Sequence, residues 1–141
     1  MKRKCRQYDV NNFLTGFPEL AERNIEVWID TDNADDILAF ILAKKKDGGY
    51  KYKKKLQRIL YLVFSNTYAK DLYTKENISD NTKDVTAMKF KGKSADNTRI
   101  YCKEIYRNGK KVVMVVKYDK DEFDKKTKNI IEKIGGYEYE F

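Results

Sequence analysis

Residues 98–119 read TRIYCKEIYRNGKKVVMVVKYD, and two strand-like runs, Thr98–Tyr106 and Lys111–Tyr118, flank the tetrapeptide Arg107-Asn108-Gly109-Lys110. An Asn-Gly pair between two such runs indicates a β-hairpin, because a type I′ turn needs positive φ at both central residues. A third strand-like run, Val85–Phe90, precedes the hairpin. We therefore expect three successive antiparallel strands that carry Lys and Arg among apolar residues.

A helical hairpin is predicted upstream of these strands. Asn24–Asp30 alternates apolar and polar residues, which is typical of a strand with one buried face. Thr31-Asp32-Asn33 then supplies helix N-cap chemistry, and apolar residues recur at helical spacing from Ala34. A second amphipathic helix should begin near Tyr50 and fold back on the first at Gly48-Gly49.

The remaining segments complete a single α+β domain over residues 1–141. We expect a helix from Glu122 to about Ile134 and a short terminal strand in Tyr137–Phe141. Met1–Arg6 is interpreted as a frayed terminus without a role. Ser65–Asp84 is interpreted as a polar linker or loop, with room for a short helical piece. In this arrangement the helices cover one face of an antiparallel three-stranded sheet and leave the other face available.

Composition points to a polyanionic partner. The chain has 30 Lys and Arg against 22 Asp and Glu, a formal charge of +8, and no histidine. Such a charge favours nucleic acid, although a basic surface can also serve solubility alone. With no His and no Cys-x-x-Cys the usual zinc sites are excluded, and the carboxylates are scattered, so we expect no metal or other cofactor.

Cys5 and Cys102 are predicted to be free thiols in a reducing compartment. The chain shows no signal-peptide pattern, and its most apolar run, Ile59–Phe64, is too short to span a bilayer. We therefore expect a cytoplasmic protein.

The motifs of the strands resemble those of the RelE/HigB-like toxins of bacterial type II toxin–antitoxin systems, including their phage-derived relatives. The similarity lies in Met88-Lys89-Phe90-Lys91, Thr98-Arg99-Ile100-Tyr101 and the run from Val112 to Lys120, and the tail Tyr137–Phe141 is also similar. It extends from about Ile25 to the terminus.

The resemblance implies a RelE-like microbial ribonuclease-type fold and a metal-independent endoribonuclease that cleaves mRNA on the ribosome. The expected product is a 2′,3′-cyclic phosphate, and the expected protein partner is a cognate antitoxin. ParE-like relatives on the same fold bind DNA gyrase instead, and a decayed relative would bind RNA or its antitoxin without cutting. These alternatives, and the oligomeric state, stay open at this point.

RNA cleavage needs a base for the 2′-hydroxyl, a cation for the phosphorane and an acid for the 5′-oxygen. Lys89 and Lys91 lie two residues apart on one strand face, so each should disfavour the charge of the other and one could act as base. The resemblance assigns Arg99 to transition-state stabilisation. Strand alternation places Tyr101 and Lys103 on the face of Arg99, where they are predicted to bind RNA.

Lys120 matches the first basic residue of the family's terminal cluster and is the fourth catalytic candidate. Lys117 and Tyr118 are further RNA-binding candidates, the tyrosine by stacking on a base. Two positions depart from the family's pattern, because Asp121 and Ala87 stand where relatives carry additional basic residues. The alternative for all these lysines is the solvent side of a half-buried sheet.

Overall fold

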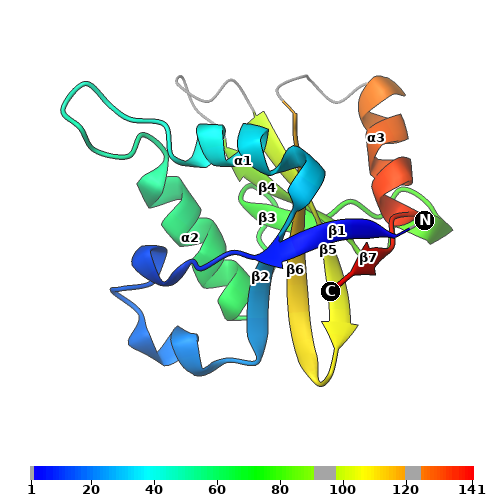
Figure 1. Cartoon of the computed structure of the whole chain (residues 1–141), viewed down its shortest axis with the longest axis horizontal. Coiled ribbons are helices and arrows are strands. Elements are labelled where there is room, and N and C mark those ends of the chain that lie inside the picture. The colour runs from blue at the N-terminus through cyan, green and yellow to red at the C-terminus, as the bar shows by residue number, and fades with distance from the viewer. Residues whose placement is uncertain (1, 91–97, 120–124) are drawn as a thin grey trace.

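The computed structural model describes residues 2–90, 98–119 and 125–141, and it shows an α+β domain with three helices and a curled, mixed sheet (Figure 1). The strands and α-helices are, in chain order, β1 (Arg3–Gln7), β2 (Ile25–Asp30), α1 (Ala34–Ile41), α2 (Lys53–Phe64), β3 (Tyr73–Lys75), β4 (Val85–Phe90), β5 (Thr98–Arg107), β6 (Lys110–Asp119), α3 (Lys125–Gly135) and β7 (Tyr139–Glu140). Short 3-10 helices are η1 (Asn11–Phe13), η2 (Pro18–Glu22), η3 (Thr31–Asn33) and η4 (Asp80–Thr82).

The seven-stranded sheet has the order β3-β4-β5-β6-β2-β1-β7. Strands β3 to β6 pair antiparallel, β2 runs parallel to β6, β1 is antiparallel to β2, and β7 is parallel to β1. The predicted antiparallel trio is therefore confirmed as β4-β5-β6, but it is only the centre of a wider mixed sheet. Of the outer strands, β1 and β3 were not predicted, because β1 (RKCRQ) lacks a regular apolar alternation and β3 is only three residues long.

The Asn-Gly hairpin joins β5 and β6 as predicted. Asn108 has φ 52° and Gly109 has φ 77°, the two positive values that a type I′ turn needs. Further along the ladder, Cys102 pairs with Val115 and Tyr101 pairs with Lys117, so β6 carries one extra residue at a β-bulge.

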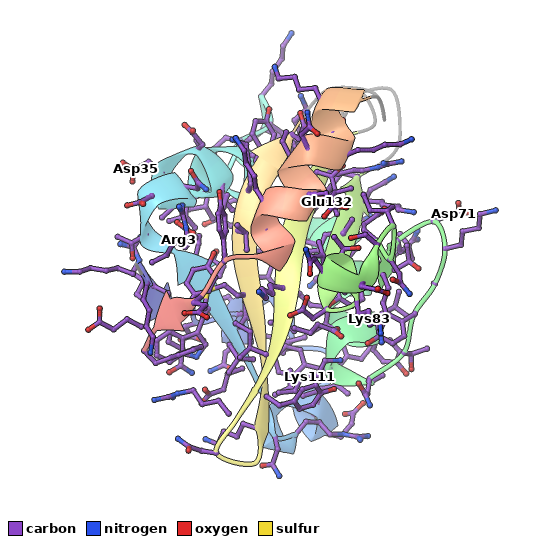
Figure 2. The ribbon with its side chains drawn as sticks, turned by 90° about the vertical axis from the view of Figure 1, so that its right-hand side faces the viewer. Arg3, Asp35, Asp71, Lys83, Lys111 and Glu132 are labelled. Atoms are coloured by element: carbon purple, nitrogen blue, oxygen red, sulfur yellow. The ribbon has the colours of Figure 1, made fainter. Side chains whose placement is uncertain are left out.

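Helices cover both faces of the sheet, which corrects our expectation of one open face. Figure 1 shows α1 and α2 on one side of the sheet and α3 on the other, and in Figure 2 α3 lies in front of the β5–β6 hairpin. Alternation along β6 explains this, since Val113 and Val115 join the core under α1 and α2, whereas Val112, Met114 and Val116 pack with α3. The uninterrupted apolar run Val112–Val116 is typical of a strand buried on both faces.

The two N-terminal helices do not form the predicted antiparallel hairpin. Residues 42–52 connect them, with a β-bridge between Lys44 and Tyr50. In Figure 1 α1 lies across the upper end of the sheet while α2 descends along its face. The stacked rings of Phe40 and Tyr52, 4.4 Å apart between centroids, join the end of one helix to the start of the other.

The N-terminal segment is a strand, so our interpretation of Met1–Arg6 as a frayed terminus was wrong for the described residues from Lys2 onward. The Arg3 guanidinium donates to the Asp30 carboxylate at 2.6 and 3.2 Å, and the Tyr139 hydroxyl donates to the same carboxylate at 2.7 Å. Asp30 is fully buried, and these donors offset the cost of burying its charge. The predicted terminal strand is confirmed as β7.

The structure also bears on membrane insertion. Within the described ranges, no helix has both the length and the apolar character required to cross a bilayer.

Gly135→Ala should destabilise the chain where α3 meets η4. A Cβ at position 135 would lie against the Asn81 carbonyl oxygen, which is backbone and cannot move aside easily. We expect the free energy of unfolding to fall by about 1–3 kcal/mol, measured by urea denaturation. Gly136→Ala is the matched control, because its nearest neighbour, the Lys133 carbonyl oxygen, would lie at an ordinary 3.6 Å. Equal stability of the two variants would contradict this packing.

Candidate functional site

The candidate site lies on the α3 side of β4 and β5, where polar side chains replace the apolar ones. Ala87 of β4 is paired with Thr74 of β3 on one side and with Tyr101 of β5 on the other. Two residues further along, Lys89 pairs with Arg99. Strand alternation therefore places Lys89, Arg99 and Tyr101 on one face, above the small side chain of Ala87.

Arg99 is the centre of this group. Its half-buried guanidinium donates a hydrogen bond to the Tyr101 phenol. Across the β5–β6 ladder it pairs with Asp119, which is largely buried. The guanidinium is thus placed between a lysine on β4 and a carboxylate on β6.

Glu76, the residue after β3, adds a carboxyl group that sequence reasoning missed. Its backbone N–H donates to the Val85 carbonyl at 2.7 Å, which continues the β3–β4 pairing by one residue. Burial raises the pKa of the Glu76 carboxyl above its usual range, and the charges of Lys89 and Arg99 partly offset that rise. A half-buried carboxyl group that holds its proton longer than usual can act as a general acid or base.

Lys89 is anchored by the segment that leads into β3. Its ammonium donates to the Lys70 carbonyl oxygen at 2.8 Å, and its backbone N–H donates to the Leu72 carbonyl oxygen at 2.8 Å. Figure 2 shows this segment at the margin of the molecule, with Asp71 pointing outward. The ammonium therefore has a fixed position next to the Arg99 strand.

Two of the predicted RNA-binding residues are enclosed in the protein. Tyr101 is only 1% exposed and packs in the core under α3. Lys103 is 8% exposed, and its ammonium donates to the carbonyl oxygens of Gly135 and Tyr137 at 2.9 and 2.6 Å. Lys103 therefore holds the C-terminal end of α3, and Tyr101 has no ring face open to a base.

The other predicted site residues are divided between the two faces or lie outside the described ranges. Lys117 is exposed and pairs with Tyr101, on the side of Arg99. Tyr118 lies on the opposite face, with its ring 5.0 Å from that of Phe40. Lys91 and Lys120 fall outside the residues that the structure describes. The structure thus brings Lys89, Arg99, Tyr101 and Lys117 to one face, without Tyr118.

A second polar cluster lies on the opposite face of the sheet from Arg99, and its side chains bond to one another. The Lys111 ammonium is 3.0 Å from Glu104, and the hydroxyls of Tyr68 and Tyr73 each donate to the Glu104 carboxylate at 2.7 Å. Lys111 also donates to the Asn66 side chain at 2.8 Å. Because both charged groups are buried and paired with each other, we interpret this cluster as a structural one.

In the described parts of the chain, no three His, Cys, Asp or Glu side chains gather closely enough to hold a metal ion. Comparison with family models, with curated proteins and with solved structures finds no match to this chain. The described site holds a carboxyl group with a raised pKa, a guanidinium and an ammonium on one sheet face.

Glu76→Gln should change how stability depends on pH. Because the pKa of Glu76 is raised in the folded chain, the folded chain keeps this proton after the unfolded chain has lost it. The free energy of unfolding therefore falls as pH rises from the usual carboxyl range through the folded pKa. Gln cannot ionise, so the variant should gain stability relative to the parent chain as pH rises through and above the usual carboxyl range, measured by urea unfolding.

Glu26→Gln is the control with the opposite sign. Hydrogen bonds from Trp28 and Lys110 lower the pKa of Glu26, so its contribution to stability is present above its unfolded pKa and is lost as pH falls. This variant should lose stability at neutral pH. If both variants changed the free energy of unfolding in the same direction at neutral pH, the environments assigned to Glu76 and Glu26 would be wrong.

Lys103→Met should destabilise the chain because Lys103 closes the end of α3. The substitution keeps the apolar stem but leaves two carbonyl oxygens without their donor, at a cost of about 1–3 kcal/mol. Lys117→Met, at an exposed position of the neighbouring strand, should leave the free energy of unfolding nearly unchanged. Urea denaturation of both variants measures the difference, and a neutral Lys103→Met would contradict this role.

Proposed function

We propose that this chain is a metal-independent endoribonuclease that cleaves mRNA, and that Arg99 and Glu76 form the centre of its active site. The single observation that carries the proposal is the pairing of Lys89 with Arg99 across β4 and β5, on the sheet face that also holds the half-buried Glu76 carboxyl within reach of both charges. These groups supply the base, the phosphate-binding cation and the acid that RNA cleavage requires without a metal.

The proposed reaction is attack of a ribose 2′-hydroxyl on the adjacent phosphorus. Glu76 accepts the 2′ proton as the new O–P bond forms, and Arg99 stabilises the charge that develops on the phosphorane oxygens. The bond from phosphorus to the 5′-oxygen then breaks, and the Lys89 ammonium donates a proton to that oxygen. The products are a 2′,3′-cyclic phosphate and a 5′-hydroxyl.

The raised pKa of Glu76 supports this assignment, because a carboxylate of ordinary pKa is a poor base at neutral pH. Tyr101 has a positioning role in the proposal, since its buried phenol accepts a hydrogen bond from Arg99 and thereby orients the guanidinium. Lys117, exposed on the same side, is available to the RNA backbone.

The substrate is proposed to be mRNA on the ribosome. Asp119 pairs with Arg99 across the ladder, and the Glu76 carboxyl lies within reach of its charge, so carboxyl groups partly offset the cations of the described part of the site. Affinity for RNA must then come from elsewhere, and a ribosome-bound substrate would be presented without tight binding by this chain.

Membership of the type II toxins, and with it neutralisation by a cognate antitoxin, is proposed from the sequence motifs. The order β2, α1, α2, β4, β5, β6 follows the element order that the resemblance implies. The expected helix and terminal strand after β6 correspond to α3 and β7, and the additions are β1 and β3, which widen the sheet on both sides of its central strands.

Arg99→Ala should reduce mRNA cleavage by about 100- to 1,000-fold, the usual cost of removing one group that stabilises a transition-state oxyanion. The measurement is primer extension on RNA from cells in which the protein is induced, together with cleavage of ribosome-bound mRNA by the purified chain. Glu76→Gln should lose cleavage while folding normally. Arg6→Ala is the matched control, because Arg6 is exposed on β1 and lies outside the site.

Full cleavage by Arg99→Ala would overturn the assignment of Arg99. DNA damage without discrete RNA cuts would overturn the nuclease proposal in favour of a gyrase-binding toxin. RNA binding without cleavage by the parent chain would overturn it in favour of an inactive relative.

A further inference from the structure

The outer side of α2 carries a hollow of about 500 Å³ that the proposed nuclease chemistry does not use. We call it the α2 groove. Its apolar floor and walls are formed by Phe17, Tyr61, Leu62 and Leu72, and its cationic rim by Lys54 and Arg58.

The groove follows one stripe of α2. Lys54, Arg58 and Tyr61 are spaced four and three residues apart, so they lie on one side of the helix. All three are exposed, and Tyr61 has 43% of its surface open to solvent. The opposite stripe, with Leu56, Ile59, Leu60 and Val63, is buried against the sheet. The helix thus has a second stripe that is cationic in its first half and apolar in its second.

Two other segments of the chain flank this stripe of α2, so that the stripe forms the floor of a groove. Phe17, the residue before η2, contacts Tyr61 edge to face with ring centroids 5.0 Å apart. Leu72, the residue before β3, forms the other wall, and its carbonyl is fixed by the Lys89 backbone N–H. A concave apolar surface of this kind, rimmed by charge, can receive the apolar face of an amphipathic helix.

We propose that the α2 groove binds an acidic amphipathic helix of another protein. The apolar residues of such a helix, at intervals of three and four, would fill the floor between Phe17 and Leu72. Its carboxylates would meet Lys54 and Arg58, and the charge of +8 on the whole chain favours an acidic partner over a basic one.

An RNA strand fits the groove less well. Two of the apolar residues, Leu62 and Leu72, are aliphatic and offer no aromatic plane for a base. The rim supplies only Lys54 and Arg58 as charged groups, whereas a backbone-tracking groove needs cations along its length. The composition therefore favours a protein segment.

This surface is separate from the proposed active site. The α2 groove lies on the α2 side of the sheet, and Arg99 faces the α3 side. The inference consequently stands or falls independently of the nuclease proposal, and variants of the groove rim should retain mRNA cleavage.

The experiment is selection from a display library of random peptides of about 16 residues, long enough for a helix of about 24 Å, with the full chain as bait. The enriched peptides should be rich in Asp and Glu and carry apolar residues at helical spacing. Fluorescence anisotropy then measures their affinity for the parent chain, for Lys54→Glu/Arg58→Glu, and for the matched control Lys4→Glu/Lys83→Glu.

The groove double variant should weaken binding by roughly tenfold or more, because both favourable charge pairs become repulsive. The control carries the same change in net charge at exposed positions of β1 and the end of η4, and it should bind within about twofold of the parent chain. Thermal melts verify that both variants fold.

Failure of any peptide to enrich, enrichment without acidic bias, or equal weakening in the two double variants would overturn the proposal. So would a single-stranded RNA oligonucleotide that loses binding through Lys54→Glu/Arg58→Glu, because the groove would then serve nucleic acid.

Discussion

The β5–β6 hairpin is the constraint on which the other elements depend, because both of its strands are buried on both faces over most of their length. Alternation sends Cys102 and Val115 into the core under α1 and α2, and Tyr101 and Met114 into the core under α3. Each helix layer therefore packs against the same two strands. The Asn108-Gly109 turn fixes the register of this pairing, so it also fixes which residues meet which helices.

The same alternation positions the candidate site. Toward its start, β5 emerges from beneath α3, and the face that carries Tyr101 carries Arg99 two residues earlier. Arg99 is thus half-buried at the boundary of the packed core, next to the Tyr101 phenol. The β-bulge beside Tyr101 shifts the last residues of β6 by one position and brings Lys117 and Asp119 opposite Tyr101 and Arg99.

Local patterns in the sequence were sufficient for the central strands and for α1. Val85–Phe90 and the Asn-Gly hairpin were predicted with nearly the observed bounds, because alternation and turn chemistry are local signals. Placing Arg99 and Tyr101 on one face followed from the same period of two. The pairing of β1 with β2 and β7 could not be predicted, because it depends on Asp30 and Tyr139, which are remote from Arg3 in the chain.

Glu76 was missed for a similar reason. It lies in a polar segment, and the pairing of Tyr73–Lys75 with β4 is what places it on the same sheet, within reach of the charges of Lys89 and Arg99. Tyr101 and Lys103 were expected at the surface because their strand was assumed to have one open face. Once α3 covers that face, the same positions become interior ones. Alternation identifies the residues that share a face, but it does not show what covers the face.

The charge of the chain is also distributed differently from what its composition suggests. Arg3, Lys103 and Lys111 are engaged with Asp30, with the end of α3 and with Glu104 respectively. Their charges stabilise internal structure and are not presented to a partner. The basic surface that remains is spread over exposed lysines, among them those of α2 and of the turn before it.

The outermost strands have a consequence for behaviour at high concentration. β3 and β7 terminate the sheet, and they are its two shortest strands, with three and two residues. A neighbouring molecule therefore finds little unpaired backbone on which to extend the sheet. The two short edge strands therefore reduce the tendency of the sheet to pair with another molecule, even though the sheet between them is wide and rich in valine.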